Sequence, residues 1–234
     1  MFRLDELGLV VTCEHGGNRV PAKFRGLFAN SQRTLDSHRG WDPGALRVAK
    51  HLAKRFEAPL VACTMTRLLV DTNRPLGHPG LFSPYSRRID EISRKPLLDY
   101  HRAHWRTVEG TIRRGLQKHR CVIHVAVHSF TPKLRGKVRE ADVALLYDPK
   151  RATERAFCDR WLQRLARSRP TWQCRRNYPY RGSAPGLTTS LRELFSDERY
   201  VGIEVEMNQR YFRPGGRGSQ MQEVVIGTLA NMLK

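Results

Sequence analysis

Short apolar runs recur along the chain, each bounded by polar or turn-forming residues, and runs of this kind predict strands. The run at 121–128, CVIHVAVH, is almost wholly apolar, which predicts a strand near the centre of a sheet with both faces covered. The predicted strands cover residues 8–13, 59–64, 68–71, 121–128, 141–147, 172–176 and 200–207.

Between these runs, apolar residues recur every three or four positions, which is the period of an amphipathic helix. Asp42 followed by Pro43 is typical of an N-cap with proline in the first turn, and the helix should continue to about residue 56. Further helices are expected at 21–29, 86–118 with an interruption at Pro96, 153–166, 190–195 and 216–234. Strands that alternate with helices predict an α/β fold of three layers, α/β/α, with a mixed, mainly parallel sheet.

The chain is strongly basic, with a net charge of +20 and 33 arginines against 9 lysines. Such a charge favours acidic ligands or polyanions, so a basic nucleic-acid-binding protein is one alternative. An arginine-rich proteome would produce the same bias without any role in binding. The arginines are spread along the chain and no nucleic-acid-binding motif is visible, which argues against nucleic acid as the partner.

The cysteines and the N-terminus bear on the compartment. Cys13, Cys63 and Cys121 each lie in an apolar run, so we expect reduced core residues of a cytoplasmic protein. Residues 1–8 lack the apolar segment of a signal peptide. No apolar run approaches the roughly 18 residues of a membrane span, so no membrane association is expected. The residues carry no prediction of oligomeric state.

Several predicted strands end in residues that can bind a metal or a substrate. His15 follows the first strand, in a turn with Gly16 and Gly17, and His128 ends the strand at 121–128. Because the carboxyl ends of parallel strands meet at one edge of a sheet, these histidines should converge. Two histidines from different strands and a carboxylate form the ligand set of a mononuclear zinc hydrolase.

Each of these groups also has a purely structural interpretation. A histidine in a glycine turn can simply be solvated, and His124, inside its strand, is expected in the core. Glu204 and Glu206 share one face of the last strand and need cations or a metal as partners. Arginines could supply those partners in a structural network.

Seven motifs occur in order between residues 10 and 212: CEHGGNRVP, HRGWDPGA, LLVDTNRP, LFSPYSR, VHSFTP, NYPYRG and GIEVEMNQRY. In this set the chain resembles the N-formylglutamate amidohydrolase-like family. The resemblance implies a phosphorylase/hydrolase-like fold related to the zinc carboxypeptidases and aspartoacylase. It also implies one N-formylglutamate amidohydrolase-like domain over residues 1–234.

The resemblance implies a Zn²⁺ cofactor with His15 and His128 as metal ligands. The related peptidases carry HxxE at the first site, and Asn18 stands here where that motif has glutamate. An amide oxygen is a poor zinc ligand, so Asn18, Glu14 and Asp42 all remain open as the third ligand.

The resemblance also implies roles in catalysis and substrate binding. Asn73 and Arg74, in a motif similar to DLNR, would hold a substrate carboxylate. Glu204 falls where the relatives keep a catalytic glutamate, with Glu206 beside it as the alternative. Further substrate contacts are expected from Tyr180, Arg181 and Arg210.

The expected function is hydrolysis of the amide bond of a small acidic N-acyl amino acid such as N-formylglutamate, with zinc-bound water as the nucleophile. A peptidase or amidase with a larger substrate is an alternative of the same class. An inactive relative is another alternative, because Asn18 departs from the HxxE pattern.

Overall fold

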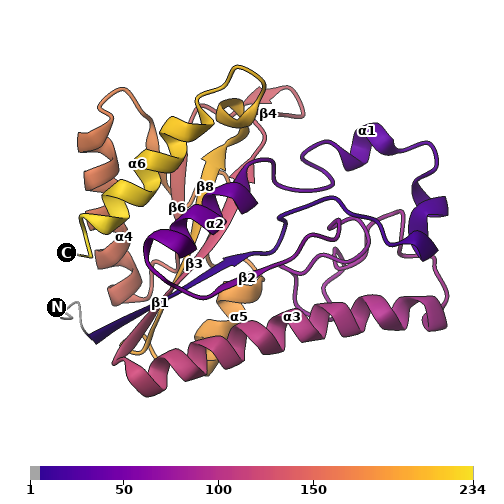
Figure 1. Cartoon of the computed structure of the whole chain (residues 1–234), viewed down its shortest axis with the longest axis horizontal. Coiled ribbons are helices and arrows are strands. Elements are labelled where there is room, and N and C mark those ends of the chain that lie inside the picture. Colours follow the sequence, from indigo (N-terminus) through magenta and orange to yellow (C-terminus); the bar gives the residue numbers. More distant parts are fainter. Residues whose placement is uncertain (1–5, 234) are drawn as a thin grey trace.

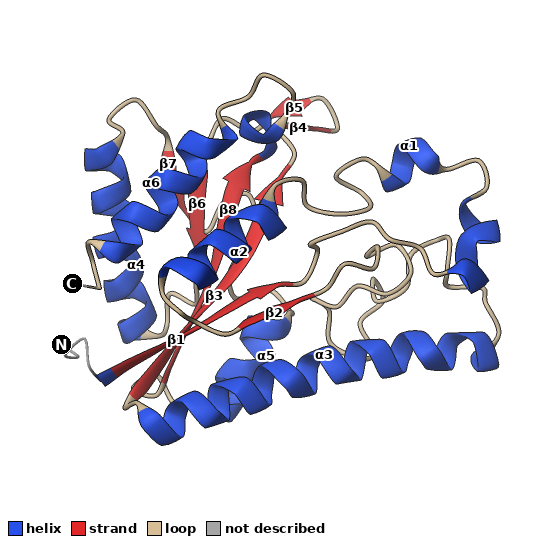
Figure 2. Ribbon diagram, in the orientation of Figure 1, coloured by secondary structure: helices blue, strands red, loops and turns tan. Residues whose placement is uncertain are grey.

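The strands of the computed structural model, which describes residues 6–233, form a mixed sheet at the centre of the fold (Figures 1 and 2). Across the six-stranded sheet the order is β2-β1-β3-β8-β6-β7, and every neighbouring pair is parallel except β6 with β8. The predicted mixed, mainly parallel sheet is confirmed. The strands are β1 (Leu7–Cys13), β2 (Leu60–Ala62), β3 (Cys121–Phe130), β6 (Val143–Leu146), β7 (Cys174–Arg176) and β8 (Tyr200–Asn208).

Helices cover both faces of this sheet (Figure 2). One face packs on α2 (Ala45–Arg55), α4 (Ala152–Ser168) and α6 (Gly218–Ala230), and the other on α3 (Glu91–Lys118) and α5 (Leu187–Leu194). Within β3, Ile123 and Val125 belong to the first apolar cluster and Val122 to the second. All ten residues of β3 are buried, as its continuous apolar sequence predicts for a strand between two helical layers.

A third apolar cluster lies outside the sheet, among the loops that precede α3. It surrounds η2 (Ala22–Phe28) and α1 (Gln32–Leu35), and it also buries Leu69 and Val70. The strand predicted at 68–71 is therefore wrong. The backbone turns there, with the N–H of Leu69 donating to Thr66, because this local cluster buries the apolar run without any partner strand.

Several helix boundaries differ from the predicted ones; α5, for example, begins at Leu187 and not at residue 190. Asp42 does not cap α2, which begins at Ala45 after Gly44 with φ of 85°, because the Asp42 carboxylate bonds to His128 instead. α3 begins at Glu91, where Asp90 accepts from the N–H of Ser93 (2.8 Å), and continues through Pro96. α6 ends at Ala230, and the predicted end at residue 234 lies outside the described residues.

Some elements were not predicted, among them the short helix α1 (Gln32–Leu35). The β4–β5 hairpin joins Lys133–Leu134 to Lys137–Val138, and η3 spans Gln209–Phe212. The segment predicted as a helix at 21–29 forms the 3₁₀ helix η2.

The five cysteines carry no disulfide, and Cys13, Cys63 and Cys121 are buried as predicted. Within residues 6–233, no helix combines the length and apolar character needed to cross a bilayer. Residues 1–5, which make up most of the segment predicted to lack a signal peptide, lie outside the described part of the chain.

Candidate active site

Two parallel strands bring His15 and His128 together at one edge of the sheet, as the sequence predicts. His15 follows the end of β1, and His128 lies near the end of β3. Their ring centroids are 5.2 Å apart. Asp42 joins them from the loop before α2, because its backbone N–H donates to the carbonyl oxygen of His15 (2.9 Å).

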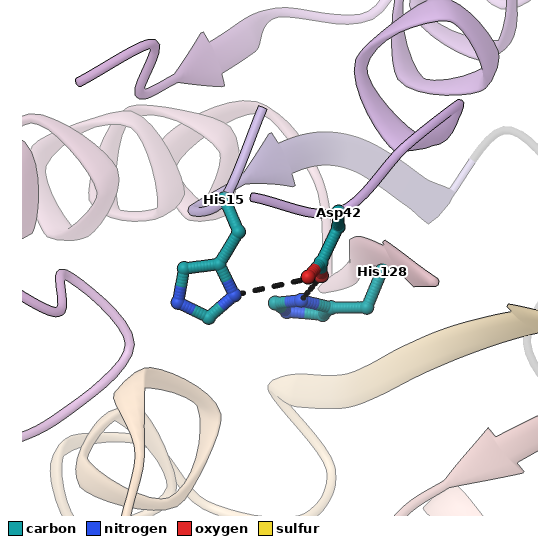
Figure 3. A group of neighbouring side chains, drawn as sticks. All are labelled: His15, Asp42 and His128. Atoms are coloured by element: carbon teal, nitrogen blue, oxygen red, sulfur yellow. Dashed lines mark hydrogen bonds and ion pairs between the residues drawn. The ribbon is translucent and has the colours of Figure 1, made fainter. Parts of the chain in front are cut away.

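The Asp42 carboxylate lies between the two imidazoles (Figure 3). Its Oδ2 atom is 2.9 Å from Nδ1 of His128 and 3.5 Å from Nδ1 of His15. One ligand atom from each of the three residues lies within 4.8 Å of the other two, and all three residues are buried. Both histidines therefore present the same ring nitrogen toward one carboxylate.

The outer nitrogen of each histidine faces a different buried carboxylate. Nε2 of His15 is 2.6 Å from Oδ1 of Asp71, and Nε2 of His128 is 3.1 Å from Oε2 of Glu14. The side chain of Arg67 lies against two of these acids, at 2.8 Å from Asp71 and 3.5 Å from Asp42.

Opposite charges set the protonation of this group. Burial alone would raise the pKa of Asp42, but contacts with His15 and His128 outweigh it and hold that pKa below its usual range. Burial would lower the pKa of His128, yet its contacts with Asp42 and Glu14 raise it well above 6.5. A metal bound here would replace a proton on His128, so its binding would release protons.

These residues fit a divalent metal. Two imidazole nitrogens and a carboxylate oxygen are the donors of known catalytic zinc sites. Nδ1 of His15 is buried, and within residues 6–233 it has no hydrogen-bond partner, only the longer contact with Asp42; a metal ion would satisfy this atom. Among the residues left open as the third ligand, Asp42 is the one whose carboxylate lies between the histidines.

A cavity of about 170 Å³ opens beside this group. Glu204 and Glu206 line it because the register of β8 against β3 places Glu204 opposite Ala126 and Glu206 opposite His128. The other lining side chains include His15, His38, Asp42, Arg67, Asn73, Arg74, His128, Ser129, Phe130, Thr131, Tyr180, Arg181 and Gln209.

The two glutamates differ in their surroundings. Oε1 of Glu204 accepts a hydrogen bond from the Thr188 hydroxyl (2.7 Å). Glu206 is buried, and its Oε2 bonds to no group in residues 6–233. Burial raises the pKa of Glu206 to about 8, against the opposing charge of His128. That pKa suits a group that exchanges protons near neutral pH.

The residues predicted to bind substrate line the same cavity with one exception. Arg74 donates to the carbonyl oxygen of Pro185 (3.1 Å), and Oδ1 of Asn73 accepts from the N–H of Leu187 (3.1 Å). Tyr180 accepts from Arg139 (3.3 Å), and Arg181 is exposed at the cavity.

Arg210 is the exception. Its guanidinium pairs with Asp142 and donates to the carbonyl oxygen of Glu140 (3.3 Å), outside the cavity lining. This arginine belongs to a structural network with Asp142, so the structure does not bring it to the cavity with the other four expected substrate contacts.

Asn18 also lies away from the two histidines. Its amide nitrogen donates to the carbonyl oxygen of Leu35 (3.2 Å) and to Asp36 (2.9 Å). After His15 the chain runs beside residues 63–64, and a Cβ on Gly17 would lie 2.6 Å from the carbonyl oxygen of Thr64. Only glycine allows this approach, which carries Asn18 away from the position of a ligand. Of the three residues left open as the third ligand, Asn18 therefore lies away from the two histidines, whereas Asp42 lies between them.

Among the cavity residues that were not singled out from the sequence, Arg67 and His38 can carry a charge. Arg67 is the one charge in the run MTRLLV and stands four residues before Asp71, a spacing that could have indicated an ion pair. His38 lies within the motif HRGWDPGA, and no separate signal distinguished it from a solvated loop residue.

Comparison with known proteins identifies a family and two similar structures. A family model described as N-formylglutamate amidohydrolase matches residues 7–213. The crystal structure of gene product Atu2144 from Agrobacterium tumefaciens is similar at 26% sequence identity and a TM-score of 0.75, covering 97% of this chain and 92% of that one. The N-formylglutamate amidohydrolase of Ralstonia eutropha JMP134 shares the fold at 17% identity and a TM-score of 0.65, covering 98% and 93%. No curated protein matches the chain.

Proposed function

The chain belongs to the N-formylglutamate amidohydrolase family, and we propose that it is a zinc-dependent enzyme that hydrolyses the amide bond of a small acidic N-acyl amino acid such as N-formylglutamate. The observation that carries this proposal is the buried group His15, Asp42 and His128 at the wall of a cavity that Glu204 and Glu206 also line.

His15, Asp42 and His128 would hold the ion. Zinc bound there would supply an activated water with a pKa of about 7 and would polarise the amide carbonyl. The chain itself must then hold the substrate, accept a proton from the water and return one to the leaving amine.

We assign the proton transfers to the pair Glu204 and Glu206. The family resemblance favours Glu204, whereas the surroundings favour Glu206. Glu206 stands opposite His128 in the strand register, and its Oε2 accepts no hydrogen bond from the described residues. The Thr188 hydroxyl already donates to Glu204 and would stabilise its charged form. We therefore propose that Glu206 makes the larger contribution and that Glu204 orients the substrate amide.

Arg74 and Arg181 would bind the carboxylates of the substrate. Arg74 is half-buried at the cavity wall, and its bond to Pro185 uses one nitrogen of the guanidinium. A planar guanidinium can grip a carboxylate through two parallel hydrogen bonds. The oxygen of Asn73 is bonded to Leu187, so its amide nitrogen is the atom that can face the substrate.

The cavity volume favours a small substrate over a peptide. About 170 Å³ is less than the roughly 300–1,000 Å³ of pockets that bind drug-sized ligands. The catalytically inactive alternative rested on Asn18, and that argument weakens because Asp42 supplies a carboxylate between the histidines.

We also propose that residues 1–234 fold as one domain in the cytoplasm. The single six-stranded sheet draws strands from residues 7 to 208, and the family match covers a similar range. Buried free cysteines are typical of reducing compartments.

A substrate panel tests the proposed reaction. Zinc-loaded protein is incubated with N-formylglutamate, N-acetylglutamate, N-formylleucine and a glutamyl dipeptide, and the released amine is quantified. We expect hydrolysis of the acidic N-acyl amino acids, fastest for the formyl group, and loss of activity when a chelator removes zinc. Zinc-independent hydrolysis, or cleavage of the dipeptide alone, would contradict the proposal.

A further inference from the structure

Glu14 is a buried carboxylate for which the proposed reaction has no direct use. The residue is only 1% exposed, and neither of its side-chain oxygens has a hydrogen-bond partner of regular geometry in residues 6–233. Each oxygen instead faces a histidine nitrogen: Oε2 lies 3.1 Å from Nε2 of His128, and Oε1 lies 3.5 Å from Nε2 of His104. A buried carboxylate at this position is costly unless such partners compensate it.

Asp42 and Glu14 contact the two ring nitrogens of His128, one carboxylate on each side of the ring. Nδ1 faces Asp42 at 2.9 Å, and Nε2 faces Glu14 at 3.1 Å. A neutral imidazole carries one N–H, and an ionised carboxylate can only accept. When the proton lies on Nε2, toward Glu14, the lone pair of Nδ1 is directed at the space shared with Asp42 and His15.

His15 is held in a parallel way. Its Nε2 lies 2.6 Å from Asp71, so its Nδ1 is the nitrogen that faces Asp42. Each histidine thus has a carboxylate on Nε2 and presents Nδ1 to the same centre. Carboxylates on the outer nitrogens of metal-binding histidines fix the tautomer and the ring orientation.

His104 completes the arrangement from the opposite side. It comes from α3, is 6% exposed, and lies against the second oxygen of Glu14. Glu14 directly follows β1, His128 lies in β3 and His104 in α3, so the packing of the helix on the sheet sets the position of Glu14. The backbone is tied as well, since the Thr72 hydroxyl donates to the carbonyl oxygen of Glu14 (2.9 Å).

We propose that Glu14 is a positioning residue for His128, holding its proton on Nε2 so that Nδ1 can bind the metal, and that His104 keeps Glu14 in place. The inference rests on the metal centre of the proposed function. It assigns Glu14, left open above as a third ligand, to the outer side of His128 instead.

The test compares Glu14→Gln with a matched control. Glutamine has nearly the same shape, but its amide is a weaker acceptor and carries no charge. Glu154→Gln makes the same change at a fully buried glutamate that pairs with Arg192 on another part of the fold. Zinc affinity is measured by competition with a chromophoric chelator, and the melting temperature of the metal-free proteins is measured by circular dichroism.

We expect Glu14→Gln to weaken zinc affinity about 10- to 100-fold, the range for lost outer partners of metal ligands. Glu154→Gln should lower the melting temperature and leave zinc affinity unchanged. His104→Gln should weaken zinc affinity less than Glu14→Gln, because the carboxylate remains. A purely structural Glu14 would change the melting temperature without changing zinc affinity.

Wild-type zinc affinity in folded Glu14→Gln would overturn the inference while leaving the metal centre intact. If Glu14→Gln fails to fold, Glu14→Asp replaces it in the test, because aspartate withdraws the carboxylate by one methylene. A wild-type zinc affinity of Glu14→Asp would also overturn the inference. If Glu14→Gln abolishes binding altogether, Glu14 is a ligand and the inference is also wrong. A wild-type chain that binds no zinc would refute the proposed function and this inference together.

Discussion

Two buried charged clusters flank β8, and their hydrogen bonding differs. In the first, which we call the Glu154–Arg192 cluster, both oxygens of Glu154 accept hydrogen bonds. The donors are Nε of Arg192 (2.9 and 3.2 Å) and the N–H groups of Gly202 (3.1 Å) and Asp148 (2.9 Å). Arg192 in turn donates to the carbonyl oxygens of Gly182 and Gly202. This cluster is saturated and ties α4 and α5 to the sheet.

The second, the two-histidine cluster, consists of His15, His128, Asp42, Asp71 and Glu14. Within the described residues, Nδ1 of His15, Nε2 of His128 and both oxygens of Glu14 lack hydrogen-bond partners of regular geometry. Buried polar groups are nearly always satisfied, so exceptions require an explanation. The comparison teaches that burial and charge alone do not distinguish the two clusters, whereas buried polar atoms without a hydrogen-bond partner do.

The largest effect should come from Glu206→Gln, beside the two-histidine cluster. The substitution keeps the shape of the side chain and removes its ability to accept a proton, so kcat should fall about 10²- to 10⁴-fold while zinc stays bound. Glu204→Gln should cost less. Steady-state kinetics and zinc content are measured together, with exposed Glu223→Gln as the control; the reverse ranking would assign the proton transfers to Glu204.

Breaking the saturated cluster should affect stability instead. Arg192→Met leaves the buried charge of Glu154 without its partner, which is expected to lower the free energy of unfolding by about 3–5 kcal/mol. Urea unfolding measures this loss, and zinc affinity of the folded variant should not change. Arg164→Met, at an exposed position on the neighbouring α4, is the control. A stability equal to wild type would show that the cluster contributes nothing.

Arg74→Lys should have an intermediate effect on kcat/KM, about 10- to 100-fold. The change keeps the charge but removes the planar fork that can bind a carboxylate through two bonds. If Arg74 only braces the loop at Pro185, the variant will lose stability and keep normal kinetics at permissive temperature. Exposed Arg213→Lys provides the baseline.

Asn18→Ala should have the smallest effect. It removes the bonds to Leu35 and Asp36, for an expected loss of about 0.5–1.5 kcal/mol in unfolding free energy. Zinc affinity should be that of wild type. A marked loss of zinc would restore Asn18 as a ligand and contradict the assignment to Asp42.

The strands that deliver the histidines could be predicted because their apolar runs are long and end sharply. Because β1 and β3 are parallel neighbours, His15 and His128 lie at the same edge of the sheet. The same argument wrongly predicted a strand at 68–71, because an apolar pattern does not reveal whether a sheet or a local cluster buries a short run.

The remainder of the site depends on contacts between distant residues. Asp42 lies 86 positions before its partner His128, and a capping pattern at Asp42-Pro43 offered a local explanation for the same carboxylate. The spacing of Asn18 from His15 suggested a metal ligand, but the turn at Gly16 and Gly17 directs the backbone so that Asn18 lies away from the histidines. The contact of Glu14 with His104 likewise arises only when α3 packs against the sheet.

Titration of zinc into the metal-free chain, followed by calorimetry, tests the central claim most directly. The account predicts about one tightly bound zinc per wild-type chain, since one group of ligands is complete. It predicts that the double variant His15→Ala/His128→Ala stays folded and binds no zinc at this site. Undiminished zinc in the double variant, or no zinc in the wild type, would show that the two-histidine cluster is not the metal centre.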